Sequence, residues 1–147
     1  MIMKRLFIAT LLLGLLPVAP VMAEQLQRFG SYELHYNAMP TADLAPEVAK
    51  AYNIDRSKNR VLVTISVLKS SRLGVAGQPV SAALEVNAVN LSQQLHQVTM
   101  REIKEGAAVY YIGDFRITPP DTLKFTVVAK PAGEKQGNTV EFSQQFF

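Results

Sequence analysis

The sequence contains no cysteine among its 147 residues. This absence excludes disulfide bonds, a thiol nucleophile and the lipid-modified cysteine of a lipoprotein. Histidine is almost as scarce, with two residues, and no serine lies in the G-x-S-x-G setting that activates a nucleophile. The sequence therefore gives no support to nucleophilic catalysis, and the hydrophobic core alone must hold the fold together.

The chain also lacks a strong excess of charge of one sign. Its formal net charge is +3, from 15 Lys and Arg against 12 Asp and Glu. Lys4 and Arg5 belong to the N-terminal leader described next, and without them 13 basic residues face 12 acidic ones, or +1. Because no large basic field is left, we expect no nucleic-acid partner.

No apolar run reaches the length of about 20 residues that spans a bilayer. The N-terminus instead has the pattern of a secretory signal: Lys4 and Arg5, then an apolar stretch at 6–16, then Val21-Met22-Ala23. We expect cleavage after Ala23 and a mature domain of residues 24–147, periplasmic or secreted, without stable membrane insertion. An uncleaved membrane anchor is the alternative, which the short apolar run disfavours.

The stretch that organises the mature chain is NRVLVTISVLK, residues 59–69. Its odd-numbered positions from 61 to 67 are all apolar, and its even-numbered positions are half apolar. Since successive side chains of a strand point to opposite faces, this pattern predicts a strand in the middle of a sheet.

Six further segments show strand patterns, which makes seven with the central one. The predicted strands are residues 31–37, 59–69, 80–88, 95–104, 107–117, 122–130 and 139–147. Residues 41–53 predict one short helix, with Thr41 or Asp43 as its cap and a core-facing stripe of Leu44, Val48 and Tyr52. Gly113 interrupts its strand and indicates a bulge or a close approach of another backbone.

This spacing predicts an all-β fold, namely an immunoglobulin-like antiparallel β-sandwich of about seven strands. The helix lies between the first two strands. We expect the 59–69 strand to be central in one sheet and the 107–117 strand to face it from the other. A small closed barrel is the alternative.

Several stretches resemble one known family. They are YELHYNAMPTADLAPEVAKAYNI, IDRSK before the central strand, REIKEG with VYYIGDF, and the ending VEFSQQFF. Together they resemble an uncharacterised family of small exported proteins of Gram-negative bacteria, a domain of unknown function. The resemblance covers nearly the whole mature chain. It implies a secreted, β-rich domain and implies no activity and no cofactor.

A copper carrier is one functional alternative, because thioether and imidazole ligands bind copper. Its candidate ligands are His35, Met39, His96 and Met100. The sequence has no H-x-M or M-x-x-M cluster, and an isolated methionine usually fills a gap in a core. We therefore assign neither a metal ligand nor a cofactor.

Carboxylate pairs are the second alternative, since acid–base catalysis needs two of them. Glu102 and Glu105 flank Lys104, and Asp114 lies near Arg116. Such pairs usually belong to solvated turns. We therefore predict no catalytic residue and a protein that is not an enzyme.

The triplet Arg56, Lys58 and Arg60 is the most suggestive charged feature. If the segment is extended, the three side chains point to one side and form a docking patch for an anionic partner or a lipid head group. The alternative is a solvated start of the central strand, whose charges prevent wrong strand pairing. We predict a non-enzymatic binding or structural module of the cell envelope, with this triplet as its candidate partner-binding site.

Overall fold

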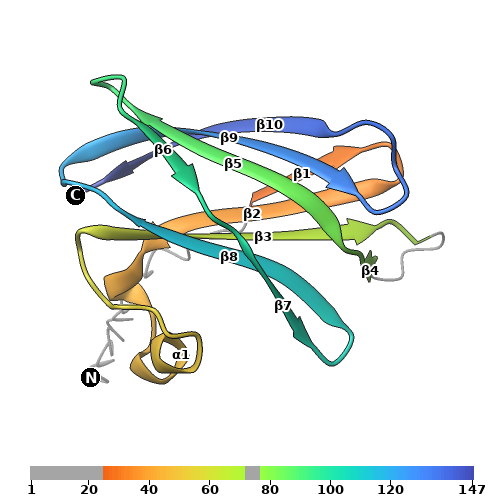
Figure 1. Cartoon of the computed structure of the whole chain (residues 1–147), viewed down its shortest axis with the longest axis horizontal. Helices are drawn as coiled ribbons and strands as arrows, with labels where there is room; N and C mark the ends of the chain where they lie inside the picture. The colour runs from red at the N-terminus through yellow and green to blue at the C-terminus, as the bar shows by residue number, and fades with distance from the viewer. Residues whose placement is uncertain (1–24, 72–76) are drawn as a thin grey trace, which may run out of the picture.

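The computed structural model describes residues 25–71 and 77–147. The predicted signal peptide, residues 1–23, and residues 72–76 lie outside the described residues. In the described ranges, ten strands form two antiparallel sheets that pack face to face (Figure 1). This arrangement confirms the predicted antiparallel β-sandwich.

The two sheets are unequal in size. Sheet A has six strands in the order β1-β2-β3-β8-β7, with β4 on the free part of β3, and sheet B has four in the order β10-β9-β5-β6. The strands of sheet A are β1 (Gln25–Phe29), β2 (Tyr32–Pro40), β3 (Arg60–Lys69), β4 (Gln78–Pro79), β7 (Arg101–Glu105) and β8 (Ala108–Arg116). Those of sheet B are β5 (Ala82–Asn90), β6 (Leu95–Val98), β9 (Asp121–Pro131) and β10 (Asn138–Phe146).

Strand β3 is central in sheet A, as predicted, between β2 and β8. Val61, Val63, Ile65 and Val67 are fully buried between the sheets. Burying each such side chain contributes about 1.5–3 kcal/mol. The aromatic residues opposite them in sheet B stack closely, with the Phe125 and Phe142 ring centroids 4.7 Å apart.

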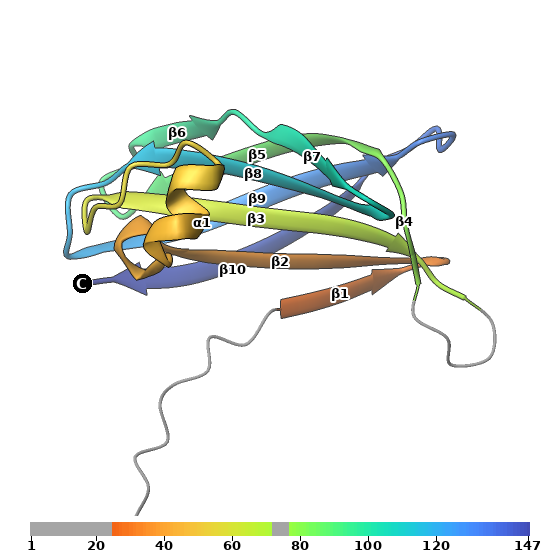
Figure 2. The same ribbon diagram turned by 90° about the horizontal axis from the view of Figure 1, so that it is seen from below.

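One end of the outer face of sheet A is covered by the short helix α1 (Pro46–Ala51), which follows the 3-10 turn η1 (Thr41–Asp43) (Figure 2). Ala49 and Ile54 pack there against Leu62 and Ile112. This second cluster explains why β3 and β8 are apolar on both faces. None of the helices in the described ranges has the length and apolar character needed to cross a bilayer.

Strands β6 and β7 form one corner of the sandwich. The sequence predicted a single strand at 95–104, but the chain leaves sheet B after Val98 and joins sheet A at Arg101. Gly113 of β8 permits this crossing: a Cβ there would lie 2.6 Å from the Thr99 carbonyl oxygen. The predicted close backbone approach at Gly113 is therefore confirmed.

Hydrogen bonds of one tyrosine side chain also connect the two sheets at this corner. The buried hydroxyl of Tyr111, in sheet A, accepts a hydrogen bond from the Ala82 amide of sheet B at 2.8 Å. The same hydroxyl donates to Glu102 Oε2 at 2.6 Å. Burial raises the pKa of Tyr111, while its hydrogen bond lowers the pKa of Glu102.

Three further details of the sequence prediction were wrong. Strand β8 does not face β3 across the core but pairs with it, Ile65 opposite Tyr111. Residues 25–29 form an additional edge strand, β1, on β2. The helix is shorter than predicted and has no side-chain cap. Its buried residue is Ala49, whereas Val48 of the predicted stripe is exposed. Thr41 instead uses its hydroxyl to bond the Asp55 carbonyl at 2.8 Å.

Candidate functional site

Four segments gather at one end of the sandwich, on the left in Figure 1. They are the loop 53–59 before β3, the β5–β6 turn at 91–94, the β8–β9 loop at 117–120 and the C-terminal Phe147. We call this surface the loop end. Loops held by a rigid sandwich are a common place for binding residues, and the hollows of the loop end include a polar cleft and a groove beside the C-terminus.

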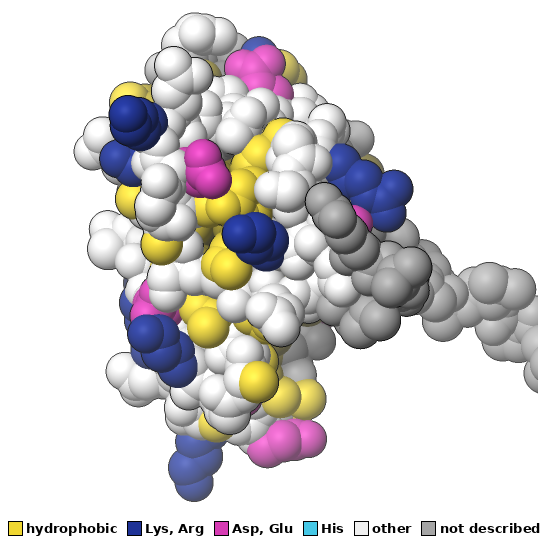
Figure 3. Space-filling model, turned by 90° about the vertical axis from the view of Figure 1, so that its right-hand side faces the viewer, with side chains coloured by type: hydrophobic (Ala, Val, Ile, Leu, Met, Phe, Trp, Pro, Cys, Tyr) yellow, Lys and Arg dark blue, Asp and Glu magenta, His cyan; other side chains and the backbone are white. Residues whose placement is uncertain are grey.

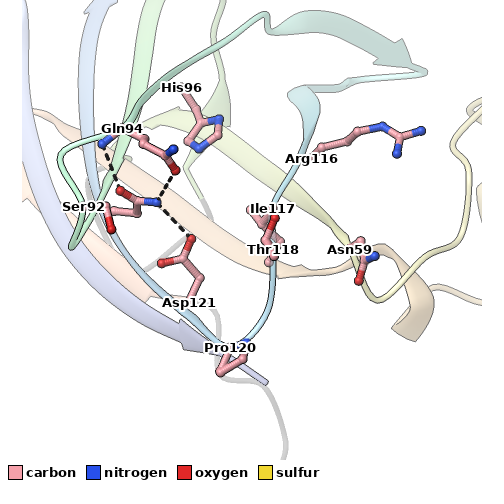
Figure 4. A pocket seen from close by; sticks show the side chains of 10 residues that line it. Asn59, Ser92, Gln94, His96, Arg116, Ile117, Thr118, Pro120 and Asp121 are labelled. Atoms are coloured by element: carbon pink, nitrogen blue, oxygen red, sulfur yellow. Dashed lines mark hydrogen bonds between the residues drawn. The ribbon is translucent and has the colours of Figure 1, made fainter.

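The first hollow is a polar cleft of about 460 Å³ (Figure 4). It is open to solvent, and hydroxyl, amide, imidazole, guanidinium and carboxylate groups line it. The lining residues are Asn59, Asn90, Ser92, Gln94, His96, Arg116, Ile117, Thr118, Pro120 and Asp121.

The floor of the cleft is a hydrogen-bonded network around the buried Asn90. The Asn90 amide nitrogen donates to Gln94 Oε1 at 2.8 Å and to Asp121 Oδ2 at 3.3 Å. Its oxygen accepts from the Gln94 backbone amide at 2.9 Å. Asp121 Oδ1 in turn accepts from the Thr122 amide at 2.8 Å. These hydrogen bonds hold the side chains of the cleft floor in one arrangement.

Three side chains on the walls of the cleft can contact a ligand. His96 lies against Phe115, with ring centroids 5.1 Å apart. Arg116 is exposed and forms no ion pair with another residue of the described ranges. The Gln94 amide nitrogen stays available, because its oxygen takes the bond from Asn90. This cleft can hold a small polar molecule or a polar side chain of a partner.

The second hollow is a groove of about 480 Å³ beside the C-terminus. Lys58 lies on it, together with Phe147, whose side chain is 84% exposed. The complete lining is Pro40, Ala42, Asp43, Lys58, Gln144, Gln145, Phe146 and Phe147. Lys58 and Asn59 are adjacent in the chain, so the groove and the cleft are neighbours.

The structure separates the three basic residues that the sequence grouped. Lys58 lies on the groove, and the Arg56 guanidinium donates to the carbonyl oxygen of Ala42, a groove residue, at 2.8 Å. Arg60 instead forms an ion pair with Asp114, its Nε 2.8 Å from Oδ2. Two of the three are therefore at the loop end, and the third holds β3 to β8.

The four candidate copper ligands do not come together. Met39 packs in the cluster beneath α1, whereas Met100 packs against the core between the sheets. His35 lies on the outer face of β2, 3.6 Å from Glu33, and His96 lies on the polar cleft. Among the described residues there is no group of three or more His, Asp and Glu that could hold a metal ion.

The candidate carboxylates are engaged in structural contacts. Glu102 accepts from Tyr111 and lies 3.1 Å from the Lys104 ammonium. Glu105 accepts from Tyr52 at 2.5 Å, and this bond raises the pKa of Tyr52. Asp114 pairs with Arg60, so no hollow described above gathers these carboxylates with a histidine.

Sequence reasoning missed most of the loop end. Its most exposed large hydrophobic residues are Leu91 and Phe147, at 79% and 84% exposure, and Leu95, next to the turn at the start of β6, is 60% exposed. The polar run around Leu91 predicted a turn, but nothing in the sequence indicated that this turn would lie near the C-terminus.

The fold and this surface define a class: a small two-sheet β-sandwich with a loop-lined end. The chain belongs to the family described as domain of unknown function DUF4426, whose profile matches residues 26–147. This match confirms the family resemblance. No curated protein matches the chain.

Solved structures agree with this assignment. A DUF4426 family protein from Pseudomonas aeruginosa is 30% identical, with a TM-score of 0.70 over 84% of this chain and 94% of that one. A copper-bound variant of FetP from uropathogenic Escherichia coli is 12% identical, with a TM-score of 0.60 over 84% and 95%. FetP as isolated is 14% identical, with a TM-score of 0.53 over 84% and 92%. The FetP similarity concerns the fold.

Proposed function

We propose that this protein is a non-enzymatic binding module of the cell envelope, which docks another envelope protein on its loop end. In this proposal residues 1–23 are a signal peptide, and the mature chain begins at Glu24 as one periplasmic domain. The mass of the protein purified from the periplasm tests the export step, because cleavage after Ala23 removes a defined mass.

One observation carries the proposal. The two most exposed large hydrophobic side chains of the described ranges, Leu91 and Phe147, belong to the loop end, and the third, Leu95, is the first residue of β6 next to the β5–β6 turn. Exposed large hydrophobic side chains at one end of a molecule are candidate contacts for a partner. Lys58 and Arg116 add cationic groups at the rim.

This composition also indicates what the partner offers. Protein interfaces place apolar anchors in the middle and polar or charged groups at the rim. The partner should therefore present an apolar pocket for Phe147 or Leu91, with carboxylates placed to meet Lys58 and Arg116.

Site-specific photocrosslinking in living cells tests the proposal. A photoreactive phenylalanine analogue replaces either Leu91 or Phe147, and we expect both positions to capture the same envelope protein. The matched control places the analogue at Lys135, in the β9–β10 turn at the opposite end. Figure 3 shows that end, where side chains of both charges surround a narrow hydrophobic strip. Equal capture from Lys135, or no capture from either loop-end position, would overturn the proposal.

Binding of the captured protein in purified form then tests the chemistry. The variants Lys58→Glu and Arg116→Glu should each weaken binding, and more so at low salt, because rim charges act over a distance set by ionic screening. Lys135→Glu makes the same charge change at the other end and should leave the affinity unchanged.

A copper carrier is the second candidate, and the copper-bound FetP relative supports it. Within this chain only one of the four candidate ligands, His96, lines the polar cleft. Calorimetric titration with Cu(I) and Cu(II) tests this candidate. Uptake that His96→Gln abolishes and His35→Gln preserves would favour it; absence of uptake would remove it.

A further inference from the structure

Strand β10 has a free edge. All nine of its residues pair one-to-one with β9, from Asn138 opposite Ala129 to Phe146 opposite Asp121, without a bulge. No other described strand pairs with it, so β10 ends sheet B (Figures 1 and 2). Its outward-directed backbone amides and carbonyls are a template for another strand.

The other edge strands of the described ranges are protected. Strand β6 has four residues and β4 has two, while β7 carries four charged residues in a length of five. Strand β1 is five residues long and includes Arg28. Short length and charge are the usual means of preventing edge pairing. Strand β10 has nine residues, no Pro, no Lys and one charged residue, Glu141.

We propose that β10 binds β10 of a second copy of this chain, antiparallel, about a two-fold axis at Phe142. Two copies of sheet B then form one continuous sheet. This inference concerns the free edge of β10, whose last residues, Gln144 to Phe146, also line the groove of the loop end. It is argued from strand pairing and does not depend on the function proposed above.

The sequence of β10 is complementary to itself in this register. Only an axis at the midpoint, Phe142, pairs all nine residues. It places Glu141 opposite Ser143 of the partner subunit, so that neither glutamate faces a like charge. An axis at Glu141 would place the two carboxylates directly opposite each other, which is destabilising.

Phe142 provides an apolar contact at the axis. Its ring stacks on Phe125 and lies 4.6 Å from the ring of Tyr36, yet it is only partly buried. Pairing about the axis brings the two Phe142 side chains together, and aromatic pairs directly opposite each other stabilise a sheet. This contact favours a second copy over an unrelated strand.

Replacing Ser143 with a negatively or a positively charged residue tests whether the two β10 strands pair in this register. Ser143→Glu would place a carboxylate opposite the partner's Glu141 twice across the axis and weaken the dimer. Ser143→Lys would place an ammonium there and tighten it. From two cross-strand pairs we expect shifts of roughly 2- to 30-fold in the dissociation constant, in opposite directions.

Effects within one chain should be small, which separates them from effects on the dimer. Ser143 pairs with Lys124 of the neighbouring strand β9. Glu141, which pairs with Lys124 at 3.0 Å, lies two residues away on the same face of β10. A charge at position 143 therefore meets one like and one opposite charge within its own chain, and both variants should change the stability of the single chain only slightly. Thermal unfolding at low concentration measures this effect. Ser92→Glu and Ser92→Lys, in the exposed β5–β6 turn, control for net charge.

Sedimentation equilibrium of the full mature chain over a wide concentration range is the measurement. We expect reversible dimers in the native protein, weaker with Ser143→Glu, tighter with Ser143→Lys and unchanged with either Ser92 variant. A native protein that stays monomeric at every concentration overturns the proposal. So do dimers that the two Ser143 variants shift in the same direction.

Discussion

Replacing Gly113 with alanine should destabilise the protein by about 3 kcal/mol, because the new methyl group has no space. An added Cβ would lie 2.6 Å from the Thr99 carbonyl oxygen and 2.8 Å from both Met100 Sδ and Val98 Cγ1. The methionine can move, but the carbonyl belongs to the backbone of the corner. Restoring ordinary contact at 3.4 Å requires a shift of about 0.8 Å in that backbone.

Thermal unfolding followed by circular dichroism measures this effect. For a domain of this size, 3 kcal/mol corresponds to a fall of about 10 °C in the melting temperature. Gly106→Ala is the control: Gly106 has a φ of +58° and no neighbour within 4 Å, so only backbone strain of about 1–2 kcal/mol is expected. A Gly113→Ala melting temperature within a degree of the native value would refute the steric argument.

Three further predictions concern polar contacts. Tyr111→Phe removes the acceptor of the Ala82 amide and should lower the free energy of unfolding, measured in urea, by about 2–3 kcal/mol. An unchanged unfolding midpoint would show that this hydrogen bond does not stabilise the fold. The pKa of Glu102 is lowered in the fold, so its stabilising effect is present above its ordinary pKa of 4.5 and is lost as the pH falls through the lower folded value. Stability measured against pH should therefore fall less steeply on the acid side in Tyr111→Phe than in the native protein. Thr41→Val keeps the shape of a fully buried side chain but leaves the Ser57 amide without its acceptor at 2.9 Å, and a loss of about 1–3 kcal/mol is expected in the same assay.

The fold class was predictable because side-chain alternation reports which faces are buried. Val61 and Leu62 lie on opposite faces of β3, and both are buried, one between the sheets and one beneath α1. Alternation does not report which strand is the neighbour. Strand β8 is apolar on both faces for the same reason as β3, so its pattern is equally compatible with lying beside β3 or opposite it.

The corner and the loop end were less predictable, for a different reason. The break between β6 and β7 falls at Thr99 and Met100, where no Gly or Pro marks it, and the space for it is provided by Gly113 in another strand. Likewise, the exposure of Leu91 depends on what the turn packs against. Arg60 was grouped with Arg56 by spacing alone, but its ion pair partner, Asp114, is distant in the sequence.

The two long sides of the sandwich differ in how they are closed. On one side a single run of backbone passes from β6 to β7, and the Tyr111 hydroxyl adds a second connection. On the other side, side-chain contacts join the sheets, such as Tyr36 with Phe142 and the 2.8 Å bond from Tyr32 to Glu134. Transient opening should therefore begin at β1 and β10 and reach the corner last. Amide hydrogen exchange should be fastest in β1 and β10, and only the protection of β10 should rise with protein concentration.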